Sequence, residues 1–130
     1  MPPNVVDPHE VTSRFLIDGQ VRAENKEVKY PAFIPPKSLK LSIFRTSTLS
    51  EEEIWTLAAE KVEPSRGPVI GRGELTVSAI AEEKLRVAPD EDPNSRHVDV
   101  VDWPVDRDAR VTLAKALAAK ASPAKMKHPD

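Results

Sequence analysis

A strand followed by a capped helix, within residues 39–62, constrains the fold of this chain more than any other feature. Side chains alternate along residues 39–45 so that three aliphatic residues share one face of a β-strand. After a Thr-Ser-Thr connection, Ser50 and Glu53 have the spacing of a capping box, and apolar residues then recur at helical spacing until Pro64. We therefore expect a sheet with an apolar face against which a helix packs.

The N-terminal segment has the composition of a β-hairpin. Residues 11–17 are rich in β-branched and aromatic side chains and precede an Asp-Gly turn, and Val21 and Val28 are placed to belong to returning strands. A short helix over residues 11–17 is the alternative. Residues 29–36 carry two aromatics between prolines, which favours an extended segment that wraps the core.

The C-terminal half has weak sequence signals for a short strand and a short helix, and strong signals for a second strand and a final helix. Residues 69–71 predict a short strand that Gly71-Arg72-Gly73 breaks, and a short helix follows over residues 76–84. Residues 97–103 alternate as a second clear strand, which Pro104 stops. Asp106 is positioned to cap a final helix whose apolar stripe extends to Ala121.

These elements predict an α+β fold, with a small mixed or antiparallel sheet packed by two or three helices and with proline-rich extended segments. The length of 130 residues suits one domain. We expect residues 1–10 to be a flexible leader, residues 11–121 to be a single α+β domain, and residues 122–130 to be a flexible tail.

The composition of the chain argues against thiol chemistry, nucleic-acid binding and membrane association. The chain contains no cysteine, which excludes disulfides and thiolate metal sites. A formal charge of −2 removes any general attraction to nucleic acid, so a nucleic-acid partner is not expected. No stretch approaches the roughly 18 apolar residues that a membrane-spanning helix needs, so we expect no membrane association and a cytoplasmic location.

One polar cluster, around His97 and Asp99, has a spacing that suits general-base catalysis or metal binding. His97 and Asp99 emerge on the same side of a strand, where the carboxylate could orient the imidazole as a general base or as part of a metal site. A structural hydrogen bond on a half-exposed strand is the alternative. The other imidazoles, His9 and His128, lie in the terminal segments, so neither a metal site nor a cofactor is expected.

Arg45, at the end of a predicted strand and followed by Thr-Ser-Thr, could offer a guanidinium and hydroxyls to a phosphate. A strand-terminal arginine followed by Ser/Thr resembles the opening strand of ADP-ribosyltransferase-type folds. That resemblance implies a downstream catalytic acid, for which Glu74 is the candidate in this sequence. Convergence of these residues with His97 and Asp99 in one pocket would favour an enzyme.

Four aromatic residues are candidates for a partner-binding surface: Tyr30, Phe33, Trp55 and Trp103. The alternative is that the tryptophans close a second small core. Since no catalytic constellation is complete, the leading hypothesis is a non-enzymatic protein-interaction or accessory module that binds a protein partner, with homo-oligomerisation left open. The alternative is a small enzyme or nucleotide- or phosphate-binding domain built around Arg45, His97 and Asp99, and a nucleic-acid accessory factor is the third option.

Overall fold

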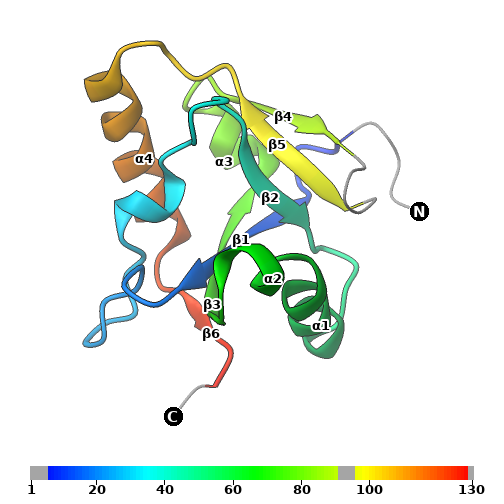
Figure 1. The fold of residues 1–130 in the computed structure, drawn as a ribbon. Coiled ribbons are helices and arrows are strands. Elements are labelled where there is room, and N and C mark those ends of the chain that lie inside the picture. The colour runs from blue at the N-terminus through cyan, green and yellow to red at the C-terminus, as the bar shows by residue number, and fades with distance from the viewer. Residues whose placement is uncertain (1–5, 91–95, 129–130) are drawn as a thin grey trace.

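The computed structural model describes residues 6–90 and 96–128, in which one antiparallel sheet has helices on both faces (Figure 1). The strand order is β4-β5-β2-β1-β3-β6. The strands are β1 (Val11–Ile17), β2 (Leu41–Arg45), β3 (Val69–Thr76), β4 (Arg86–Pro89), β5 (His97–Val101) and β6 (Lys125–Met126). The helices are α1 (Glu51–Lys61), α2 (Glu63–Arg66), α3 (Val77–Ala81), α4 (Arg107–Ala121) and the 3-10 helix η1 (Tyr30–Phe33). The predicted α+β class is confirmed.

The sheet separates two apolar layers. Leu16 faces the larger layer, which contains side chains of α4, α3 and η1, whereas Phe15 faces a smaller layer beneath α1. Neighbouring strand residues point to opposite faces, so consecutive residues of β1 supply both layers. Figure 1 shows α4 on one side of the sheet and α1 with α2 on the other.

The capping box predicted for α1 is present. Ser50 Oγ accepts from the Glu53 amide at 3.2 Å, and Glu53 Oε1 accepts from the Ser50 amide at 2.9 Å. Pro64 does not leave the chain extended, because it lies in the first turn of α2, where its missing N–H needs no helical partner. None of the helices within residues 6–90 and 96–128 is long and apolar enough to cross a membrane.

The predicted strand over residues 11–17 is confirmed, but the hairpin is wrong. The neighbours of β1 are β2 and β3, which come much later in the sequence. Val21 and Val28 instead pair with each other in an isolated bridge. The Asp-Gly turn therefore reverses the chain without returning it along β1.

Gly71-Arg72-Gly73 does not break a strand, because β3 runs through it. A Cβ on Gly71 would lie 3.0 Å from the Lys125 carbonyl oxygen and 3.1 Å from Met126 Sδ. Glycine is needed at this position for the close approach of β6, rather than for a turn.

The terminal segments are more structured than expected. Residues 122–130 were predicted as a flexible tail, but β6 pairs with β3 and Ala124 is buried, with its amide donating to the Lys26 carbonyl at 2.7 Å. At the other end, Glu10 of the predicted leader binds the buried Arg45 guanidinium. Short backbone and ionic contacts join the described parts of these segments, residues 6–10 and 122–128, to the rest of the domain, and apolar periodicity does not reveal such contacts.

Candidate functional site

The sheet opens between β1 and β2, and two arginines fill the opening. These strands pair at only two positions, Thr12 with Arg45 and Ser13 with Phe44. Beyond them, Arg14 Nη1 donates to the Ser42 carbonyl at 3.0 Å, and Arg66 Nη1 donates to the Phe15 carbonyl at 2.8 Å. The two guanidinium groups therefore satisfy strand carbonyls where the strands have separated.

Both guanidinium groups are partly desolvated, and the charge of Arg66 acts on Arg14. Burial, reinforced by the charge of Arg66, lowers the pKa of Arg14 to about 9. Burial also lowers the pKa of Arg66. Their remaining hydrogen bonds go to the Ala32 carbonyl at 2.8 Å and to Gln20 Oε1 at 3.4 Å, both neutral acceptors. Among the described residues, neither arginine forms an ion pair with a carboxylate.

The two fully buried arginines, Arg45 and Arg72, are by contrast paired with carboxylates. Arg45 Nε lies 2.6 Å from Glu10 Oε1. Arg72 Nη2 lies 2.6 Å from Glu51 Oε1, and its Nε lies 3.0 Å from Glu74 Oε2. Buried charges in proteins are usually paired in this way. Arg14 and Arg66, which are half-buried, differ from these two in donating to neutral acceptors.

A cavity of about 200 Å³ borders the two arginines. Its lining comprises Arg14, Phe15, Ser42, Phe44, Lys61, Val62, Ser65, Arg66 and His97. A second, open cavity of about 290 Å³ shares Arg14, Ser42 and Arg66 and adds Lys40. No acidic residue of the described parts of the chain lines either cavity, although the chain as a whole carries a charge of −2.

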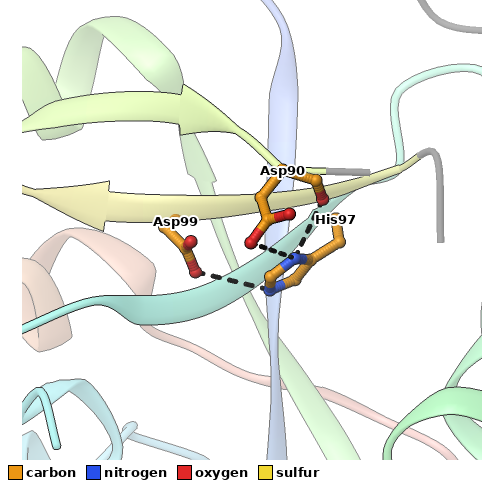
Figure 2. Close-up of side chains that lie close together, drawn as sticks. All are labelled: Asp90, His97 and Asp99. Carbon is orange, nitrogen blue, oxygen red and sulfur yellow. Dashed lines mark hydrogen bonds and ion pairs between the residues drawn. The ribbon is translucent and has the colours of Figure 1, made fainter. Parts of the chain in front are cut away.

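His97 connects this cavity to a second polar cluster, which Figure 2 shows. His97 and Asp99 emerge from β5 on one face, as predicted, with Nε2 of the imidazole 3.4 Å from Oδ1 of Asp99. Asp90, just after β4, places its carbonyl oxygen 3.0 Å and its Oδ2 3.8 Å from the other ring nitrogen, Nδ1. His97 pairs across strands with Phe44, whose ring lies at a centroid distance of 5.5 Å.

The hydrogen bond from His97 to Asp90 determines the tautomer of the imidazole. A carbonyl oxygen only accepts, so Nδ1 carries the hydrogen and, in the neutral ring, Nε2 presents a lone pair toward Asp99. Burial raises the pKa of Asp99; the positive charge of His97 opposes this effect, and the neighbouring Asp90 adds to it. The cluster thus gathers acceptors that a proton or a cation would stabilise.

The structure brings together only two of the four residues predicted for catalysis. His97 and Asp99 lie side by side, but Arg45 pairs with Glu10, and Glu74 pairs with Arg72 and with Lys125 at 3.1 Å. The arrangement that the resemblance to ADP-ribosyltransferase-type folds implied is not formed by these contacts.

Sequence reasoning missed Arg14, Arg66 and Asp90. An arginine inside the strand-like run 11–17 was a usable sign of a buried charge. Arg66 follows a helix end, and Asp90 lies in an acidic loop, where nothing local distinguishes them from exposed residues.

The four candidate partner-binding aromatics differ in exposure. Phe33 and Trp103 are buried, and Trp103 Nε1 donates to the Val100 carbonyl at 2.9 Å. Trp55 packs against the smaller layer with the Arg72 guanidinium 4.9 Å above its ring. Tyr30 is 38% exposed. Tyr30 is thus the member of the set best placed to contact a partner.

No family model, curated protein or solved structure matches this chain.

Proposed function

We propose that this protein binds a small phosphate-bearing anion in the cavity beside Arg14 and Arg66. The observation that carries the proposal is the pair of partly desolvated guanidinium groups without a carboxylate partner among the described residues. A planar guanidinium matches two phosphate oxygens and is the cation best suited to partly buried anion recognition. A bound anion would relieve the repulsion between the two arginines.

The size of the cavity limits the ligand. Pockets for drug-sized molecules occupy roughly 300–1,000 Å³, whereas this cavity measures about 200 Å³. It suits a phosphoryl group with a short substituent better than a whole nucleotide. Lys61 and Ser65, which also line it, add a third positive charge and a hydroxyl donor for the outer oxygens.

Thermal unfolding with inorganic phosphate tests this proposal at constant ionic strength, with chloride as the reference salt. A ligand that binds only the folded state at 100 times its Kd stabilises that state by about 2.7 kcal/mol. We expect Tm to rise with phosphate concentration in the wild type and to lose most of that rise in Arg66→Gln. Arg86→Gln is the matched control, since Arg86 is exposed and pairs with Asp102. A flat wild-type response, or an equal response in Arg66→Gln, contradicts the proposal.

The protein-interaction module expected from the sequence is a second proposal, and the exposure of Tyr30 favours it. An open groove of about 750 Å³ lies along η1 and α4 and includes Tyr30 and Lys115, whose Nζ is 5.2 Å from the ring centroid. Arg22 and Lys29 also line it, with Glu27 as its one acid among the described residues. The groove therefore suits an acidic segment of a cytoplasmic protein.

Fluorescence anisotropy with a labelled acidic peptide tests this second proposal. Tyr30→Ala should weaken binding at least about tenfold if the tyrosine anchors the partner. Val105→Ala, which alters a residue that is 87% exposed outside the groove, should bind as the wild type does. Equal binding by Tyr30→Ala and the wild type contradicts this proposal.

A further inference from the structure

We propose that Asp90, His97 and Asp99 form a binding site for one divalent transition-metal ion. Each of these residues offers one ligand atom, and the three atoms lie within 4.8 Å of one another. Figure 2 shows the carboxyl groups of Asp90 and Asp99 directed at the imidazole, each joined to a different ring nitrogen by a dashed line. The inference does not depend on the proposed phosphate binding: His97 also lines that cavity, but the proposed ligand atoms belong to neither Arg14 nor Arg66.

The arrangement of His97 and Asp99 is unfavourable without a positive charge between them. Nδ1 of His97 donates to the Asp90 carbonyl, so in the neutral ring Nε2 has a lone pair that faces Asp99 Oδ1 at 3.4 Å. In that neutral form two acceptors face each other, and both residues are only 6% exposed. Water therefore screens the repulsion poorly. A cation bound by both atoms converts this contact into an attraction.

The hydrogen bond to the Asp90 carbonyl is also the one that a metal-bound histidine usually makes. Histidine ligands commonly donate the ring N–H that is not used for the metal to a carboxylate or backbone carbonyl, which orients the ring. Here that bond already leaves Nε2 available. Tetrahedral ligands at roughly 2.0–2.2 Å from Zn²⁺ are about 3.4 Å apart, which matches the distance from His97 Nε2 to Asp99 Oδ1.

Asp90 supplies the third ligand from outside the sheet. Its side chain is 47% exposed, so the carboxylate can turn toward an ion that His97 and Asp99 hold. One imidazole and two carboxylates, in a chain without cysteine, suit Zn²⁺ or Mn²⁺ better than Ca²⁺, which takes six to eight oxygen ligands. Sequence reasoning counted only imidazoles as further ligands and so did not include Asp90.

Isothermal titration of the full chain with Zn²⁺, after chelator treatment and dialysis, tests the site. We expect one ion per chain in the wild type and at least about tenfold weaker binding in His97→Gln and in Asp99→Asn. The matched control is the double variant His9→Gln/His128→Gln, which removes the other two imidazoles and should bind as the wild type does. Circular dichroism of each variant verifies that the fold is retained.

Two results would overturn the inference. One is a wild type that binds no Zn²⁺. The other is binding that persists in both cluster variants or disappears in the terminal-histidine control, since either outcome places the ion elsewhere. Titration with Zn²⁺ in phosphate-free buffer keeps this outcome separate from that of the anion proposal.

Discussion

His97 and Asp99 lie two residues apart on β5 with Nε2 and Oδ1 separated by 3.4 Å, while the other imidazole nitrogen donates to Asp90. The backbone of β5 fixes this relationship, because strand residues two positions apart share a face. Asp99 cannot turn away easily, since it is 6% exposed and its strand pairs with β2 and β4. A buried carboxylate is therefore held beside Nε2 of the imidazole, which is an acceptor when the ring is neutral.

Asp99→Asn should raise the Tm of the metal-free protein at pH 7 by a few degrees. The substitution removes a desolvated negative charge, and an Asn amide can donate to His97 Nε2 where the carboxylate cannot. The same variant should lose Zn²⁺ binding, so stability and binding change in opposite directions. Asp102→Asn, on an exposed residue paired with Arg86, is the control for a general effect of charge. A lower Tm for Asp99→Asn than for the wild type contradicts this prediction.

The stabilisation by Asp99→Asn should depend on pH. Burial raises the pKa of Asp99 in the folded state above the value of about 3.9 for an unfolded chain. The ionised carboxylate thus opposes folding above the folded-state pKa, and this opposition disappears as the pH falls through that pKa toward the unfolded value. The difference in Tm between variant and wild type should be largest near pH 7 and small near pH 4. A difference that stays constant or grows on acidification contradicts the assignment.

The fold was more predictable from the sequence than the site. Ser50, Thr76 and Asp106 begin helices as local capping chemistry predicts, periodicity located β2 and β5, and β-branched and aromatic composition favoured β1. These signals involve residues close in sequence. The opening between β1 and β2 depends on how far two strands pair, and Arg14 and Arg66 meet there although 52 positions separate them in the sequence. No local pattern encodes such a contact.

Gly71→Ala should reduce the free energy of unfolding by about 1–3 kcal/mol, the range for overpacking. The new Cβ would lie 3.0 Å from the Lys125 carbonyl and would displace β6. Urea unfolding of Gly71→Ala, in the full chain and in a chain that lacks residues 123–130, measures the energetic coupling between Gly71 and β6. The effect should be smaller in the shortened chain, where the clash with Lys125 is absent. An equal effect in both chains would show that β6 is not the constraint.

Leu117→Ala should be among the most destabilising substitutions in α4. Leu117 is fully buried in the larger apolar layer, and truncation of such leucines costs about 2–5 kcal/mol. Leu113, one turn earlier, is only partly buried, so Leu113→Ala should cost clearly less. Chemical denaturation of both variants measures the difference, and equal values would contradict the packing described for this layer.

Anion binding by the Arg14–Arg66 pair is tested most directly by an NMR titration of the wild type with inorganic phosphate that follows the arginine Nε–H signals. We expect saturable shifts for Arg14 and Arg66 and little change for Arg72, whose guanidinium is already bound by Glu51 and Glu74. Signals of Arg14 and Arg66 that do not move, or that move no more than that of Arg72, would contradict it.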